Sequence, residues 1–147
     1  MSELSIDRIG PTRRPAGPAQ GLQRWRTLLF AHWEVPVEVL RPLLPPSLTV
    51  DTYEGRAYVG LVPFTMRDVR PLRRLPPFPG TGDFHETNVR TYVLRDGRDP
   101  GVWFFSLDAA SRLAVWAART FFHLPYRYAT MDMQVAGPEV TYQVRGA

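Results

Sequence analysis

Residues 56–66 of the chain read RAYVGLVPFTM, and this stretch decides the fold class. Successive side chains of a strand point to opposite faces, so the residues divide into two alternating sets. Both sets are apolar here: one holds Ala57, Val59 and Leu61, and the other holds Tyr58, Val62 and Phe64. A strand that is apolar on both faces lies inside a protein, as in a filled barrel. The stretch therefore predicts an interior strand of a mainly β domain.

The neighbouring segments predict further strands and two helices. Strands are expected at residues 25–33 (largely buried), 48–53, 84–95, 102–107, 126–135 and 139–144, with tight turns at Glu54-Gly55 and Asp96-Gly97. Residues 35–44 predict a short helix that Pro45-Pro46 ends, and residues 109–122 predict a longer helix behind Asp108 as N-cap. Because strands and helices do not alternate regularly, we predict an α+β domain, mainly β and barrel-like, with both helices packed on it.

The chain is long enough for one domain with a real core. Residues 1–21 mix Pro, Gly, Arg and Ser without an apolar period, which predicts a disordered N-terminal tail, and residues 22–147 are expected to form the single domain. The last residues follow directly on a predicted strand, and such an ending leaves an exposed strand edge. Either a partner chain covers this edge, which favours a homo-oligomer, or the polypeptide is shorter than its ancestral domain.

Composition argues against several classes of function. There is no cysteine, hence no thiolate nucleophile or thiolate metal site, and the three histidines lack ligand spacing. All 18 basic residues are arginines and they are scattered, whereas nucleic-acid binding needs a concentrated basic face. The most apolar stretch, residues 102–122, contains three charges and does not suit a membrane span. We expect a cytoplasmic protein without a cofactor, a metal, a nucleic-acid partner or a membrane partner.

Residues 69–83 contain four prolines and do not predict regular structure. Within them, residues 73–79 (RRLPPFP) match a ligand motif of SH3 domains, which read polyproline II helices. A loop that closes over a site or packs beside it is the favoured alternative.

Four stretches together resemble the YqjF-like bacterial protein family. They are residues 32–36 (HWEVP), residues 86–93 (ETNVRTYV), residues 103–109 (WFFSLDA), and Ala118-Arg119 with Leu124-Pro125-Tyr126. This family resembles the acetoacetate decarboxylase-like superfamily, whose fold is a β-barrel around a pocket. The resemblance implies the same barrel here. Because members of the family are typically longer, it also implies that the last part of the domain is missing.

The decarboxylases of that superfamily carry a Gly-Phe-Pro-Lys-Lys signature, whose first lysine forms an imine with the substrate. The similar stretch here, residues 123–127, reads HLPYR, and the chain contains no lysine at all. Aligned on the proline, Tyr126 takes the place of the nucleophilic lysine and Arg127 that of its cationic neighbour. Imine formation needs a free amine, which neither a phenol nor a guanidinium offers. We therefore exclude lysine Schiff-base decarboxylation.

The strand at residues 84–95 holds the main candidate site. Alternation places four polar or aromatic residues on one face: Glu86, Asn88, Arg90 and Tyr92. This face points either to water or into a cavity, where Arg90 would grip a carboxylate and Glu86 would balance its charge. The pattern favours the water-facing alternative slightly. The resemblance favours the cavity, since pockets of the superfamily hold Glu and Arg.

Further candidates lie on and behind the longer helix. Asp108 is expected to cap that helix rather than to act in catalysis. Arg119 is expected to form a buried ion pair, with an exposed position as the alternative, and Arg127 is a candidate ligand-binding residue. Tyr126 and Tyr128 share one strand face, where they either line a cavity or pack in the core.

Two hypotheses of function follow. In the favoured one, the protein binds a small carboxylate or carbonyl compound in a polar pocket formed by Glu86, Asn88, Arg90, Tyr92, Arg119, Tyr126 and Arg127. In the alternative, it is an enzyme of lyase or isomerase type that performs acid-base chemistry on a small organic acid. Glu86 or Tyr126 would then move protons while Arg90 holds the anion.

Overall fold

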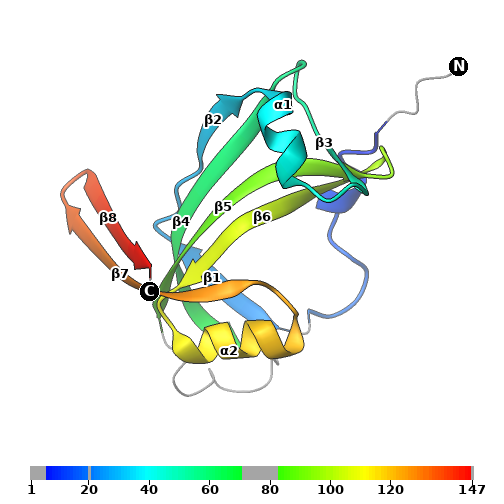
Figure 1. Ribbon diagram of the computed structural model, residues 1–147. Coiled ribbons are helices and arrows are strands. Elements are labelled where there is room, and N and C mark those ends of the chain that lie inside the picture. Colours follow the sequence, from blue (N-terminus) through cyan, green and yellow to red (C-terminus); the bar gives the residue numbers. More distant parts are fainter. Residues whose placement is uncertain (1–5, 20, 71–82, 147) are drawn as a thin grey trace, which may run out of the picture. The chain divides into compact units, whose positions relative to one another are not determined.

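The computed structural model describes residues 6–19, 21–70 and 83–146. Most of the regular structure in these residues is β (Figure 1). The strands are β1 (Leu22–Arg26), β2 (Ala31–Val35), β3 (Leu48–Val50), β4 (Ala57–Arg70), β5 (Phe84–Arg95), β6 (Asp99–Ala109), β7 (Tyr126–Ala136) and β8 (Glu139–Gly146). The helices are α1 (Val37–Leu40) and α2 (Arg112–Phe121), with the 3-10 turns η1 (Gly10–Thr12) and η2 (Arg41–Leu43).

The strands form one sheet in the order β1-β4-β5-β6-β7-β8, and β2 and β3 pair with β4 and β5 outside this path. Strands β1 and β4, β3 and β5, and β7 and β8 run antiparallel, whereas β6 and β7 run parallel over three residues. The parallel pair is possible because α2 connects β6 to β7 and carries the chain back, as parallel strands require. The sheet is therefore mixed, and the prediction of a mainly β, α+β chain is confirmed.

The described residues divide into two compact units. The first unit holds residues 6–17, Ala31–Gly60 and Val89–Phe105, and the second holds residues 18–19, 21–30, 61–70, 83–88 and 106–146. The single domain expected over residues 22–147 stays a prediction.

The first unit contains α1, β2, β3 and parts of the long strands. Its helical segment is short because Pro45-Pro46 follows it, and Leu40 and Leu44 are the buried side chains of this segment. The predicted turn is present: Tyr53 and Arg56 exchange two backbone hydrogen bonds around Glu54 and Gly55. Both turn residues have positive φ, the conformation of the tight turns that connect antiparallel strands.

The second unit has its core on β4. Val62, Phe64 and Met66 are buried together, with Val69 and Phe84 packed against them. The Trp25 ring of β1 lies 4.7 Å from the ring of Phe64, centre to centre. Thr65, on the opposite face of β4, is buried as well, so both faces of this strand are enclosed as the sequence predicts.

Helix α2 starts later than expected. Asp108 lies within β6, where Leu107, Asp108 and Ala109 pair with β7 and keep the backbone extended. Ser111 is the N-cap instead, and its Oγ accepts a hydrogen bond from the Ala114 amide at 3.2 Å. The predicted capping role of Asp108 is therefore wrong, because strand pairing continues through it.

The buried strand expected at residues 25–33 is also wrong. It is two strands, β1 and β2, separated by residues 27–30, where Thr27 has a φ of 49°. Trp25, Leu29, Phe30 and Trp33 are all substantially exposed. β1 is the first strand in the sheet order, and an apolar run is buried only where other elements cover it.

The expected tail contains ordered structure. Asp7 accepts hydrogen bonds from the amides of Ile9 and Gly10, and this local side-chain turn precedes η1. The proline-rich prediction, in contrast, falls largely on residues 71–82, outside the described residues. None of the helices in the described residues is long and apolar enough to cross a membrane.

Candidate functional site

The polar residues of β5 are buried rather than solvated. Glu86 and Asn88 are each only 4% exposed. Thr87 and Thr91, from the opposite set, are buried too, and the Thr91 hydroxyl donates a hydrogen bond to the Tyr58 carbonyl at 2.9 Å. The water-facing alternative is thus wrong for Glu86 and Asn88, because both faces of this strand are enclosed.

Glu86 has a phenol as its partner. The Tyr126 hydroxyl donates a hydrogen bond of 2.7 Å to Oε1 of Glu86, and both residues belong to the second unit. Glu86 lies on β5 and Tyr126 on β7, and β6 lies between these two strands in the sheet order. The structure therefore joins two of the residues that the sequence proposed for the site, although they are far apart in the chain.

Burial controls the protonation of this pair. Desolvation raises the pKa of Glu86 to about 7, against a smaller lowering effect of the Tyr126 hydrogen bond. Burial, and next the charge of Glu86, raise the pKa of Tyr126 above its ordinary value. The phenol therefore keeps its proton and acts as a donor, while Glu86 exchanges its proton near neutral pH. Of the two catalytic candidates, Glu86 is the better suited to proton transfer.

Asn88 lies two residues beyond Glu86 on the same face of β5. Its Oδ1 atom is buried and has no hydrogen-bond partner among the described residues. A buried amide oxygen without a partner is costly, and a donor from water or a ligand would relieve that cost. Asn88 is thus an open hydrogen-bonding position next to a buried acid.

Thr65, His85 and Tyr142 form a second polar cluster in the second unit, which the sequence did not predict. The Thr65 hydroxyl and His85 Nδ1 are 3.0 Å apart, and the His85 ring meets the Tyr142 ring edge-on at 5.4 Å. The Tyr142 hydroxyl donates to the Phe64 carbonyl at 2.6 Å. Burial raises the pKa of Tyr142, against a hydrogen bond to Thr65 that lowers it, and the Glu86 charge adds a smaller increase. No spacing in the sequence links these residues, because β4, β5 and β8 are distant in the chain.

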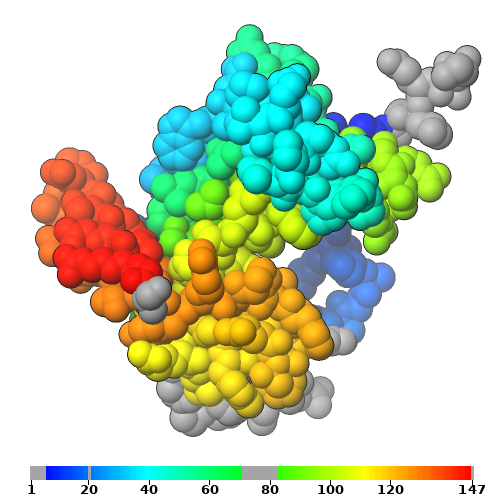
Figure 2. Space-filling model, in the orientation of Figure 1, coloured from blue at the N-terminus to red at the C-terminus, as the bar shows by residue number. Residues whose placement is uncertain are grey.

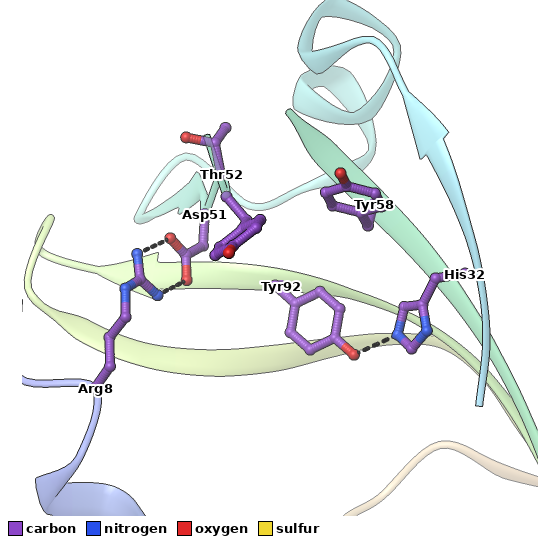
Figure 3. A pocket seen from close by; sticks show the side chains of 7 residues that line it. Arg8, His32, Asp51, Thr52, Tyr58 and Tyr92 are labelled. Atoms are coloured by element: carbon purple, nitrogen blue, oxygen red, sulfur yellow. Dashed lines mark hydrogen bonds and ion pairs between the residues drawn. The ribbon is translucent and has the colours of Figure 1, made fainter. Parts of the chain in front are cut away.

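The first unit contains an open pocket of about 370 Å³ (Figure 3). It is lined by Arg8, His32, Asp51, Thr52, Tyr53, Tyr58 and Tyr92. His32 Nε2 and the Tyr92 hydroxyl are hydrogen-bonded at 2.7 Å. Gly60 makes room for this histidine, since a Cβ atom there would lie 3.0 Å from His32 Nε2. Of the predicted ligand-binding residues, only Tyr92 lines this pocket.

Arg90 belongs to the first unit, where its guanidinium carbon lies 5.7 Å from the centre of the Tyr92 ring. That distance is within the range of a cation–π contact. The proposed grip of Arg90 on an anion stays a prediction.

The two remaining arginines of the predicted site lie on the surface. Arg119 is exposed in the last turn of α2, and no ion pair of its side chain is present among the residues that the structure describes. The expectation of a buried ion pair is wrong, because Arg119 lies outside the buried face of this helix around Val115. Arg127 is exposed as well, and its Nε lies 3.3 Å from Oδ1 of Asp108. The Arg127 side chain is 66% exposed and that of Asp108 17%, so the pair lies at the surface on its arginine side.

No cluster of three or more His, Asp or Glu side chains that would hold a metal ion is present in the described part of the chain.

Comparison with known proteins places the chain among relatives. Residues 22–147 match the model of the DUF2071 family, described as an uncharacterized conserved protein. The chain is 51% identical over 120 residues to the uncharacterized protein YqjF of Bacillus subtilis strain 168, covering 82% of this chain and 49% of that relative.

A solved structure shows the fold. The chain superposes on acetoacetate decarboxylase from Legionella pneumophila with a TM-score of 0.65 and 19% sequence identity, over 88% of this chain and 46% of that one. The predicted acetoacetate decarboxylase-like fold and the YqjF-like resemblance are confirmed. The chain spans about half the length of both relatives.

The burial of Glu86 predicts an unusual dependence of stability on pH. Its pKa in the folded protein, about 7, lies above the ordinary value of 4.5, so folding favours the protonated form. The free energy of unfolding should therefore fall as the pH rises from 4.5 to about 7, and stay low above that range. Glu86→Gln keeps an acceptor for Tyr126 but carries no charge. At about pH 8 this variant should be more stable than the wild type by up to about 3 kcal/mol.

Urea denaturation at several pH values measures this difference. Glu139→Gln is the matched control, because Glu139 is exposed in the same unit and should change stability little. A Glu86→Gln variant that is no more stable than the wild type at alkaline pH would contradict the burial of a charged Glu86.

Proposed function

Since the chain belongs to the DUF2071 family and has an acetoacetate decarboxylase-like fold without any lysine, we propose that it binds a small carboxylate or carbonyl compound beside Glu86. The observation that carries this proposal is the buried group formed by Glu86, Tyr126 and Asn88. Its three side chains offer a titrating acid, a phenol, and an amide oxygen that has no hydrogen-bond partner among the described residues. The chain spans about half the length of the proteins that it matches, so any activity of a full-length protein of this family is a proposal as well.

The geometry suggests how a ligand would be held. Oε1 of Glu86 is engaged by Tyr126, which leaves Oε2 to carry the proton. A protonated Oε2 can donate a hydrogen bond to a carbonyl or carboxylate oxygen of the ligand. Asn88 would then accept a hydrogen bond from a ligand hydroxyl through Oδ1, or donate one through its amide nitrogen. The ligand would complete the hydrogen bonding that the fold leaves open.

The position of Tyr126 supports a route without an imine. By the resemblance to the decarboxylases, Tyr126 takes the place of the lysine that forms the Schiff base. In this chain the residue at that place is hydrogen-bonded to a buried carboxyl group. A phenol with a raised pKa is a poor nucleophile and a good hydrogen-bond donor, so binding and polarisation of a carbonyl group suit this pair better than covalent chemistry.

Acid-base catalysis on the bound compound is the second candidate function. It is favoured by the pKa of Glu86 near 7, the range in which a group both accepts and releases protons readily. In this mechanism the Glu86 carboxylate would remove a proton from the carbon next to the ligand's carbonyl group. The Tyr126 hydroxyl, which donates to Glu86 in the structure, would turn to the ligand and donate its one proton to the enolate oxygen in a hydrogen bond. Glu86 would later return the proton to carbon or oxygen, as an isomerase requires.

Binding should depend on pH if Glu86 donates to the ligand. A thermal-shift screen of small carboxylates, keto acids and neutral carbonyl compounds is run on the wild type. Near saturation, a ligand should stabilise the fold by roughly 3 kcal/mol. The affinity should be roughly tenfold lower at about pH 8 than at about pH 6, because only the protonated form donates. In Glu86→Gln this pH dependence should disappear.

Two controls sharpen the screen. Asn88→Ala should weaken the binding of a ligand that bonds to the Asn88 side chain, whereas the exposed Arg119→Ala should not change it. Compounds that bind are also incubated in D2O. Incorporation of deuterium next to the carbonyl group by the wild type, and not by Glu86→Gln, supports catalysis over binding alone. A screen in which no compound stabilises the protein at either pH would contradict the proposed function.

We further propose that a second copy of the chain covers the free edge of β8, the last strand in the sheet order. The hairpin of β7 and β8, orange and red in Figure 2, presents Val135, Val140 and Val144 as exposed apolar side chains. Light scattering at micromolar concentration should then give the mass of at least two chains. Replacing Val140 and Val144 with threonine should shift the mass toward one chain, and a wild type of single-chain mass would contradict the proposal.

A further inference from the structure

The Asp51 carboxylate lines the pocket of the first unit and is already paired with Arg8. The Asp51 side chain is 10% exposed, and the Arg8 guanidinium binds both of its oxygens. Arg8 Nη2 lies 2.6 Å from Oδ1, and Nη1 bonds Oδ2. A bidentate pair of this kind is the strongest arrangement between arginine and a carboxylate, and it raises the pKa of Arg8 above its ordinary value.

Aromatic rings form much of the remaining wall. Tyr53, Tyr58 and Tyr92 line the pocket together with His32, whose ring lies 5.8 Å from the Tyr92 ring. Figure 3 shows Tyr58, Tyr92 and His32 on one side and the Arg8–Asp51 pair on the other. The negative faces of aromatic rings attract cations, and a carboxylate among them adds to this preference. The wall therefore suits a positively charged ligand with an apolar body.

Arg8 differs from the rest of the pocket in its place in the chain. The other lining residues fall between His32 and Tyr92, inside the region that matches the family model, whereas Arg8 precedes that region. Its side chain is 50% exposed, in contrast to that of Asp51. The carboxylate is thus a built part of the pocket, and the guanidinium reaches it from the N-terminal segment.

We propose that this pocket is a binding site for a small organic cation that carries a guanidinium, amidinium or ammonium group, and that Arg8 is its internal competitor. With Arg8 bound, the Asp51 side chain is 10% exposed, so the carboxylate lies in a position that a cation already fills and that a ligand of the same charge can take. A bound cation would displace Arg8 from Asp51 and place its apolar body against the tyrosines and His32. This site does not depend on Glu86 and is separate from the proposed function.

The proposed competition for Asp51 is tested by replacing Arg8 with alanine, which removes the competing guanidinium. Benzamidinium serves as the probe, and benzamide, which has the same shape without the charge, serves as the control ligand. Affinity is measured by isothermal titration calorimetry for the wild type, Arg8→Ala and Arg13→Ala. Arg13 is an exposed arginine of the same segment and forms no ion pair among the residues that the structure describes. Arg8→Ala should bind benzamidinium roughly tenfold more tightly than the other two proteins.

The carboxylate is tested in the same background. Adding Asp51→Asn to Arg8→Ala should abolish the gain, and benzamide should gain nothing in any of the proteins. Equal affinity of Arg8→Ala and wild type would overturn the proposal, as would an equal gain for benzamide or undiminished affinity in the double variant. Circular dichroism checks the fold of each variant. If the double variant does not fold, the comparison of Arg8→Ala with Arg13→Ala alone decides.

Discussion

Glu86 is 4% exposed, and Oε1 of its carboxyl group accepts a hydrogen bond from Tyr126. Placing an acid there costs free energy whenever the acid is charged, and the phenol offsets only part of that cost. Residues 86–88 of β5 are buried on both faces of that strand, and the burial of Glu86 raises its pKa to about 7. The proposed function depends on this constraint, because an acid in water would titrate far below neutral pH and would give no pH dependence of binding between about pH 6 and about pH 8.

Much of the fold could be predicted from the sequence. The strand at residues 84–95 has the predicted bounds, and β4 is buried on both faces as its two apolar sets indicate. The alternation of apolar and polar residues fails to predict burial where burial depends on which other elements cover the strand. Apolar residues at 25–33 form two exposed strands because little covers them, and Asp108 stays extended because β7 pairs alongside it. Local patterns describe one strand at a time, whereas burial is a property of the whole sheet.

Only part of the candidate site could be predicted, because sequence patterns describe single strands and not the contacts between strands. Alternation placed Glu86 and Asn88 on one face, and the resemblance singled out Tyr126, but neither showed that Tyr126 lies 2.7 Å from Glu86. The pairs Arg8–Asp51, His32–Tyr92 and Thr65–His85 gave no signal at all. Each joins residues at least 20 positions apart through the pairing of strands and the path of the N-terminal segment. The fold thus holds a buried acid in the second unit and, in the first, a pocket in which a carboxylate lies among aromatic rings.

The central claim is that Glu86 titrates near neutral pH inside the fold, and direct titration of its carboxyl carbon tests that claim best. The protein is labelled with 13C at the glutamate side chains, and the Glu86 signal is identified by its absence from Glu86→Gln. Its chemical shift is then followed by NMR across the pH range in which the protein stays folded. A midpoint near 7 is the result that the account predicts. A midpoint near 4.5, the ordinary value for glutamate, would show an accessible carboxylate and contradict the account.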